Sequence, residues 1–298
     1  MKVKKGMRRA RGDLFFELVM GSFLLVVALV TLFPILFVVA ASLSSPQAVI
    51  AGQVWIWPVD PTLKAYENIL SNPKLSLGFL NSAIYTILGT ITSIALTLMM
   101  AYPLSKLRLP GRKLLTWMLV FTMLFSGGLI PTYMVVRQLG LLDTWWAVVL
   151  TSALSPWNVF IARTYFRSLP DELYESATID GSGELGQFFR IAIPLSSPII
   201  AVVGLFSAIA YWNSYFTALI YLSDEALFPL QIVLRDILIL GNLDLTRVFD
   251  FDAMVRRQGL SDLLKYAVIV VASAPLLVLY PLVQKYFVRG LLIGSIKG

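Results

Sequence analysis

The chain has 298 residues, of which 58% are hydrophobic and 14% charged, and its formal net charge is +7. Soluble domains carry about 25% charged residues, so this composition indicates a protein with much of its surface in a lipid bilayer. The sequence contains no cysteine and no histidine. This excludes disulfides and thiolate chemistry, and it removes the commonest general base and transition-metal ligand.

Six apolar stretches occur along the chain, at about residues 18–42, 79–101, 114–136, 145–162, 199–222 and 266–283, and none contains Asp, Glu, Lys or Arg. Each is close to the roughly 20 residues that a helix needs to cross a bilayer core. The first is too long for the roughly 7–15-residue core of a cleaved signal peptide, so we interpret it as a retained anchor. We therefore predict an all-α integral membrane protein with six transmembrane helices.

The distribution of charge predicts the orientation of these helices. The leader, residues 1–17, is basic, and six crossings return the tail, residues 291–298, to the same side. The four segments on that side hold sixteen Lys and Arg against seven Asp and Glu, whereas the three opposite segments hold eight against ten. Positive charge is retained on the cytoplasmic side, so we expect both termini in the cytoplasm. A nucleic-acid-binding arm is the alternative for the leader, and the hydrophobic anchor beside it argues against this.

A polar segment of about 36 residues, 163–198, then lies in the cytoplasm. Ser168 followed by Asp171 fits a capping box, and Gly181 is placed to end a helix in the left-handed conformation. Apolar residues repeat at helical spacing in both halves: Leu169, Leu173 and Ala177, then Leu185, Phe188, Phe189 and Ala192. Pro194 and Pro198 are expected to break the chain before the fifth span. The pattern predicts two short helices around a turn, either lying on the inner leaflet or docking to a cytoplasmic partner.

The same segment carries a family resemblance, in Glu175-Ser176-Ala177, Asp180-Gly181, Phe189, Pro194-Leu195 and Pro198. These residues resemble the coupling motif of ABC importer permeases, which usually begins Glu-Ala-Ala; Ser176 is a small-for-small departure. In that family the motif helix sits in a cleft of the ATPase subunit. The resemblance therefore implies an ATPase-coupling role for Glu175, Ser176, Ala177, Asp180 and Gly181. The plainer interpretation of Asp180-Gly181 is a turn.

Further segments resemble the carbohydrate-importer branch, and among these the permeases for complex oligosaccharides such as alginate or pectin fragments. They are Asn81-Ser82, Ala101 to Ser105, Ser126 to Thr132, Tyr211 to Tyr215 and Phe228 to Gln231. The resemblance implies the type I permease fold over residues 18–290, in a bacterial inner membrane. It also implies four kinds of partner: a second homologous permease, two copies of a cytoplasmic ATPase, an extracytoplasmic solute-binding protein and an oligosaccharide. No nucleic acid is expected.

No glycine in the chain is followed by lysine, so the phosphate-binding loop of ATPases is absent. We expect no cofactor in this chain; Mg-ATP would be bound and hydrolysed by the partner ATPase subunits. Ser126-Gly127-Gly128, within an apolar stretch, is interpreted as a place of close helix packing.

A path for sugars needs hydroxyl or amide groups and aromatic surfaces. Ser207, Tyr211, Ser214 and Tyr215 fall at helical spacing in the fifth span and predict one polar aromatic stripe, with Asn213 on another side. The alternative is that these side chains join helices by hydrogen bonds. A second polar series, Thr86, Thr90, Ser93 and Thr97, faces either the cavity or a neighbouring helix.

Two outer loops are expected, residues 43–78 and 223–265. The second is long enough to be functional. By resemblance it reaches into the solute-binding protein, and we predict that contact at Leu240, Gly241, Asn242 and Leu243.

The function predicted is therefore a non-catalytic permease subunit of an ATP-driven oligosaccharide importer. A permease for a non-sugar solute is the nearest alternative. A secondary transporter is disfavoured because ion coupling generally needs ionisable groups near the membrane midplane, and the six stretches have none.

Overall fold

The computed structural model describes residues 11–236, 263–281 and 284, and every regular element within these ranges is a helix. The chain divides into two units, Met1–Ile69 with Gly241–Val271, and Leu70–Leu240 with Ala272–Gly298. Most of the predicted leader, the tail 291–298 and the residues predicted to contact a binding protein, Leu240 to Leu243, lie outside the described residues.

The first unit contains the long helix α1 (Arg11–Ser42), the short helix α2 (Pro46–Ile50) and the beginning of α3 (Lys64–Ser71). Apolar side chains along α1 are exposed over most of its length, as expected for a helix in contact with lipid. Only its C-terminal end is packed, where Ala40 and Ala41 lie against Ala48 and Val54. There the hydroxyl of Ser42 also pairs with that of Tyr66 at 2.7 Å.

Three helices are long and apolar enough to cross a membrane: Phe15–Ser42, Pro73–Ser105 and Leu263–Pro281. Three further pairs meet the same criterion only when two helices separated by a sharp bend are taken together. The described chain thus has three candidate spans, or up to six if each bent pair is one span.

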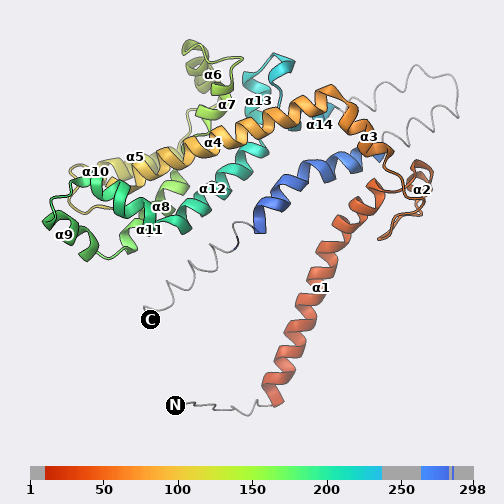
Figure 1. The fold of residues 1–298 in the computed structure, drawn as a ribbon, viewed down its shortest axis with the longest axis horizontal. Helices are drawn as coiled ribbons and strands as arrows, with labels where there is room; N and C mark the ends of the chain where they lie inside the picture. The colour runs from red at the N-terminus through yellow and green to blue at the C-terminus, as the bar shows by residue number, and fades with distance from the viewer. Residues whose placement is uncertain (1–10, 237–262, 282–283, 285–298) are drawn as a thin grey trace. The chain divides into compact units, whose positions relative to one another are not determined.

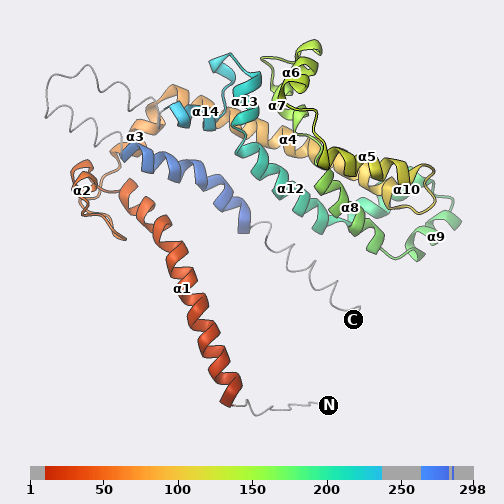
Figure 2. The same cartoon turned by 180° about the vertical axis from the view of Figure 1, so that it is seen from behind.

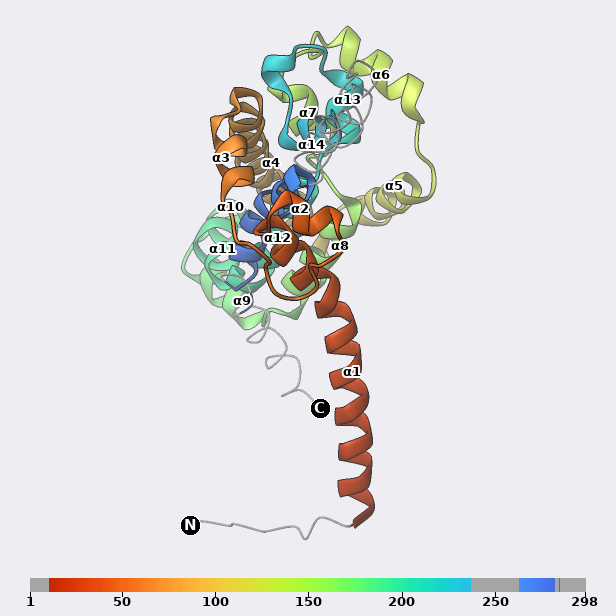
Figure 3. The same ribbon diagram turned by 90° about the vertical axis from the view of Figure 1, so that its right-hand side faces the viewer.

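Three of the expected spans are interrupted and do not form continuous helices. The stretch 114–136 is divided into α5 (Arg112–Leu124) and α6 (Leu129–Gln138), which are bent by 115° relative to each other. Figure 3 shows that the two helices point in different directions. Helix α5 ends at Leu124, and Gly128, with φ +82°, directly precedes α6 in a backbone conformation that favours glycine. No atom comes within 4 Å of a Cβ built on Gly127, so within this chain the pair makes a break and not a packed contact.

The stretch 145–162 is divided into α7 (Trp145–Thr151) and α8 (Pro156–Ser168), bent by 54°. Proline disfavours a helical conformation in the residue before it, and Ser155 is accordingly extended. The expected fifth span, 199–222, is divided into α12 (Ser197–Trp212) and α13 (Phe216–Tyr221).

The second unit is built around α4 (Pro73–Ser105), which contacts α12, α8, α14 (Leu230–Arg235) and α7. Figures 1 and 2 show α13 and α14 towards one end of α4, and α9 (Glu172–Ile179) and α10 (Glu184–Gln187) at the other. Small residues bring α4 and α12 together: Gly89 lies against the ring of Tyr211, and the hydroxyl of Ser207 donates to that of Ser93 at 2.9 Å. Close approach of this kind is the usual basis of helix association in membranes.

Side chains at the start of α4 hold the segment that follows α13. The amide of Asn81 donates to the carbonyls of Ala226 and Phe228, at 2.8 and 3.1 Å. The hydroxyl of Tyr85 donates to the carbonyl of Leu227, and Ser82 accepts from the backbone N–H of Leu230, both at 2.8 Å. These four contacts tie the 3₁₀ turn η2 (Glu225–Leu227) and the start of α14 to α4.

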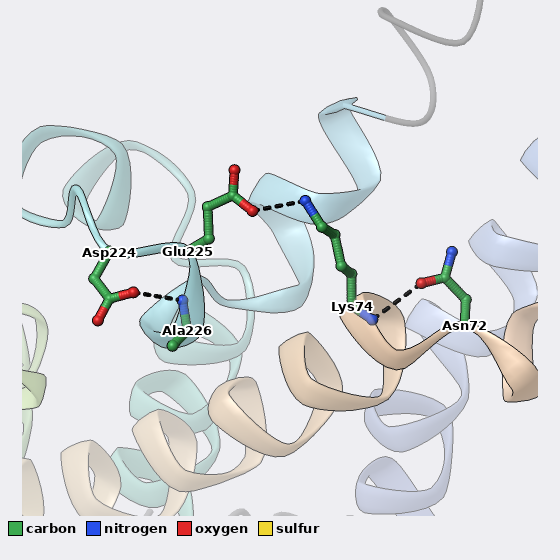
Figure 4. Close-up of polar contacts among 5 residues, drawn as sticks. All are labelled: Asn72, Lys74, Asp224, Glu225 and Ala226. Atoms are coloured by element: carbon green, nitrogen blue, oxygen red, sulfur yellow. Dashed lines mark hydrogen bonds and ion pairs between the residues drawn. The ribbon is translucent and has the colours of Figure 1, made fainter.

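Figure 4 shows the exposed edge of this connection. The ammonium of Lys74 pairs with the carboxylate of Glu225 at 2.6 Å. Beside it, Asn72 caps α4 by accepting from the backbone N–H of Lys74, and Asp224 caps η2 by accepting from that of Ala226. These caps satisfy N–H groups that a helix start leaves without partners.

Candidate functional site

The predicted coupling loop forms the helix, turn and helix expected from its sequence. Helix α9 ends at Ile179, Asp180 follows as its C-cap, and Gly181 adopts φ +78°, which confirms the predicted left-handed end. The backbone N–H groups of Gly181 and Ser182 then return to the carbonyls of Thr178 and Ala177, at 3.0 and 2.8 Å. Because the chain turns so sharply, the end of α9 projects as a short exposed tip.

The predicted capping box at Ser168 is wrong. Ser168 is the last residue of α8, and its hydroxyl donates to the carbonyl of Tyr165 at 2.7 Å. Pro170 holds Leu169 in an extended conformation, so α8 ends one residue earlier and Ser168 belongs to its last turn. Asp171 directly precedes α9 and makes no side-chain cap.

The five coupling candidates lie together on and beside α9. Glu175, Ser176, Asp180 and Gly181 are exposed, and Ala177 is half-buried. Next to them Ile179 is 87% exposed, which is unusual for an isoleucine at a protein surface. The tip of α9 therefore offers carboxylates and an apolar side chain on one accessible surface.

The residue that anchors α9 is Tyr174, which the sequence analysis did not single out. Its ring is buried, with the ammonium of Lys106 3.2 Å from the ring centroid and the ring of Tyr102 6.3 Å away. Burial raises the pKa of the Tyr174 phenol and lowers the pKa of Lys106, the latter opposed by the carboxylates of Glu184 and Asp171. A cation over an aromatic face thus ties α9 to the end of α4.

A second buried contact fixes the turn. The side-chain amide of Gln187, on α10, donates to the hydroxyl of Thr178 at 2.8 Å and to the carbonyl of Ser182 at 3.2 Å. Gln187 is buried although it lies on a polar segment. The sequence offered one signal for this role. Gln187 lies between Leu185 and Phe188 and one helical turn after Gly183, a position from which its side chain can reach the preceding turn.

The second helix of the loop is formed by α10, a single π-helical turn (Phe188–Ala192) and α11 (Ile193–Leu195). Phe188 is buried against Tyr102, with ring centroids 5.0 Å apart, whereas Leu185 and Phe189 are exposed. Pro194 does not break the chain as expected, because it lies in the first turn of α11, where no N–H is required. The break comes at Ser196, where the chain bends by 78° into α12.

The candidates for a substrate path divide into two groups. Ser207 and Tyr211 are buried, and both hydroxyls have partners in this chain: Ser93 for the first and the carbonyl of Val149, at 2.7 Å, for the second. Ser214 and Tyr215 lie beyond the end of α12, so the expected continuous stripe is wrong. Asn213, which ends α12, donates to the carbonyl of Ile209 in competition with the backbone.

Residues 75–293 match the family described as the binding-protein-dependent transport system inner membrane component. The chain belongs to this family of ABC transporter permeases. The permease is thus a multi-pass protein of the inner membrane and a non-catalytic transport subunit.

Two curated relatives come from Bacillus subtilis (strain 168). The permease is 44% identical to the protein LplC over 272 residues, which cover 91% of each chain. It is 42% identical to the polygalacturonan/rhamnogalacturonan transport system permease protein YtcP, covering 95% of this chain and 98% of that one. Among solved structures, a chain of a bacterial ABC transporter involved in import of the acidic polysaccharide alginate matches with TM-score 0.84 and 33% identity. That match covers 94% of this chain and 99% of the other.

Proposed function

We propose that this permease forms half of the pore of an oligosaccharide importer and is driven by a separate ATPase through the tip of α9. The observation that carries the proposal is the arrangement of the coupling loop. Glu175, Asp180 and Gly181 are exposed, while the neighbouring Tyr174 is buried against the end of α4. A partner that moves the exposed tip therefore moves a side chain seated on a membrane-spanning helix.

The orientation follows from the charge distribution of the loops, with the leader, the loop 163–198 and the tail in the cytoplasm. Two ATPase subunits, binding Mg-ATP, act on this permease and on a second homologous one. The binding protein delivers its solute from the opposite side, and Leu240, Gly241, Asn242 and Leu243 contact it there. The six crossings are the three long helices, the bent pairs α5–α6 and α7–α8, and the segment from α12 to α13.

The substrate we infer is an oligosaccharide derived from an acidic polysaccharide of the pectin or alginate type. Two lines of support agree on this class: the relative named as a polygalacturonan/rhamnogalacturonan permease and the structural likeness to an alginate importer. The test is uptake of oligogalacturonides and alginate oligosaccharides by the permease reconstituted with its partner permease, ATPase and binding protein. Failure to transport either substrate, in a complex whose ATPase is active, would contradict the substrate assignment.

The coupling role is tested by Glu175→Lys, which reverses the charge of an exposed side chain on the tip. The expected result is loss of co-purification with the ATPase, or assembly with uptake reduced at least tenfold, a change of about 1.4 kcal/mol. Glu67→Lys, on α3 in the predicted outer loop, is the matched control and should leave assembly unchanged. Normal assembly and uptake with Glu175→Lys would refute the assignment.

A further inference from the structure

A groove of about 370 Å³ lies where α4, α8 and α12 meet beside the break between α7 and α8. Its volume is within the roughly 300–1,000 Å³ of small-molecule sites. The lining residues that matter here are Ser152, Ser155, Trp157, Asn158, Phe206 and Ser207. Of these, only Ser207 was expected to face a substrate.

Asn158 gives the groove a polar side chain that can bind a ligand. It is 5% exposed and lines the groove, and within the described part of the chain its amide has no hydrogen-bond partner. Ser152 and Ser155 likewise make no side-chain hydrogen bond to any described residue. The amide and these hydroxyls thus keep hydrogen-bonding capacity that a ligand in the groove can use.

The backbone at the groove supports the same conclusion. Residues 152–155 are not helical, although they lie inside a bent pair that meets the criterion for a membrane span. Irregular backbone at membrane depth is tolerated only where it is buried in protein or lines a water-filled cavity. Ser152 is exposed and Ser155 is half-buried, so neither is fully enclosed by the rest of this chain.

The chemistry of the lining selects the kind of ligand. No lining residue is charged, so a bare carboxylate or an inorganic ion finds no counter-charge in the groove. Trp157, 60% exposed, and Phe206 present aromatic surfaces beside the unpaired amide and hydroxyls. A lipid chain would cover the aromatic rings and leave the amide unpaired. A pyranose ring offers both an apolar face and hydroxyls that donate and accept.

We propose that this groove is a sugar subsite of the translocation path, in which Asn158, Ser152 and Ser155 bind the hydroxyls of one ring and Trp157 covers its face. The inference rests on the proposed oligosaccharide transport and adds the residues that contact the sugar. The subsite binds the neutral part of each sugar unit, so any carboxylate of the substrate points away from it.

The chain has no cysteine, so Asn158→Cys creates a single thiol in it. In the assembled complex, a hydrophilic thiol reagent is expected to label this cysteine, and saturating oligogalacturonide with binding protein and ATP should slow the labelling severalfold. Ala162→Cys, one turn further along α8 and fully buried, is the matched control and should not be labelled. An unreactive Asn158→Cys, or labelling that sugar does not slow, would overturn the proposal.

Transport gives an independent readout. Asn158→Leu keeps the size of the side chain and removes its amide, and we expect uptake to fall about tenfold, as for the loss of one to two hydrogen bonds. Thr164→Val, a polar-to-apolar change on the same helix and outside the groove, should leave uptake unchanged. Normal uptake by Asn158→Leu would refute the subsite while the proposed function stands. A wild-type complex that does not import the oligosaccharide would instead refute the proposed substrate.

Discussion

Gly89 is a residue whose lack of a side chain determines how closely α4 and α12 pack. A Cβ built at this position would lie 2.5 Å from the ring carbons of Tyr211, a distance that real contacts do not reach. The ring cannot yield easily, because its hydroxyl is held by the carbonyl of Val149. The glycine therefore fixes both the distance between the helices and the position of a side chain that lines the groove.

We predict that Gly89→Ala destabilises the permease by about 1–3 kcal/mol, as overpacking of a close helix contact does. The measurement is the midpoint of thermal unfolding of the purified complex. Gly21→Ala is the control: Gly21 lies inside α1 with no atom within 4 Å of a Cβ, so alanine should be neutral or slightly stabilising. Equal unfolding midpoints for the two variants would contradict this account of Gly89.

Lys106 is a second single residue with a structural role, because its ammonium contacts α9 from the end of α4. Lys106→Met keeps most of the stem and removes the charge above the Tyr174 ring, an interaction of about 0.5–2 kcal/mol. If α9 drives the pore through this contact, sugar transported per ATP hydrolysed should fall severalfold while ATPase activity persists. Lys113→Met, at an exposed position in the first turn of α5, should leave the ratio unchanged. A normal ratio for Lys106→Met would exclude the contact from coupling.

Among contacts between elements, those joining α4 to the segment 225–230 are partly buried and partly exposed, and we expect the buried ones to contribute more to stability. Asn81→Leu leaves the carbonyls of Ala226 and Phe228 without their donor, and we expect a loss of about 1–3 kcal/mol of stability. Lys74→Ala removes the solvent-exposed ion pair with Glu225. Both side chains are about 70% exposed, so the expected loss is below about 1 kcal/mol. Thermal unfolding of both variants tests the order, and the reverse order would refute it.

Asp143 connects a second pair of elements, the loop before α7 and the end of α13. Its carboxylate accepts from the backbone N–H groups of Ser223 and Asp224, and these bonds hold the pKa of Asp143 below its usual value. The charged form is favoured in the folded state. The stabilisation is therefore present above the usual pKa of an aspartate, about 3.9, and is lost as the pH falls through the lowered value.

We accordingly predict that amide hydrogen exchange at Ser223 and Asp224, corrected for its intrinsic pH dependence, shows unchanged protection between about pH 7 and 5. Protection should be lost only as the pH falls below about 3.9, the usual pKa of an aspartate. Asp143→Ala should remove protection at every pH, because it removes the acceptor and places an alanine at φ +54°. Asp143→Asn keeps an acceptor and tolerates that conformation, so it should preserve most of the protection. Loss of protection near neutral pH in the wild type would contradict the cause given for the lowered pKa.

For the whole molecule, the proposed orientation places the outer loop 43–78 and the short basic loop after α4 on opposite sides of the membrane. Trp57 and Leu107 are exposed residues of these two segments. In the cysteine-free chain, an impermeant thiol reagent added to intact spheroplasts should label Trp57→Cys and not Leu107→Cys. Both should be labelled after permeabilisation. The opposite pattern would reverse the orientation and remove the coupling loop from the reach of an ATPase.

Much of this permease was predictable from local sequence. Hydropathy over windows of about 20 residues identifies the segments that leave water, and the left-handed Gly181 follows from a glycine at the end of an amphipathic repeat. The resemblance carried by Glu175 to Pro198 predicted the family. These features depend on composition and on neighbours within a few residues, which is the information that a single sequence holds.

Other features required the tertiary structure. Hydropathy does not register a bend, so it did not locate the breaks at 125–128, 152–155 and 213–215, although Pro156 directly follows the second of them. Tyr174, Gln187 and Asn158 acquire their roles from residues up to about seventy positions away or from the absence of any partner. The sequence by itself determined a membrane permease and predicted where its coupling loop lies. Only the packing of α4 against α8 and α12 decided which polar side chains are satisfied within the chain and which remain available to a substrate, because hydrogen bonding depends on positions in space.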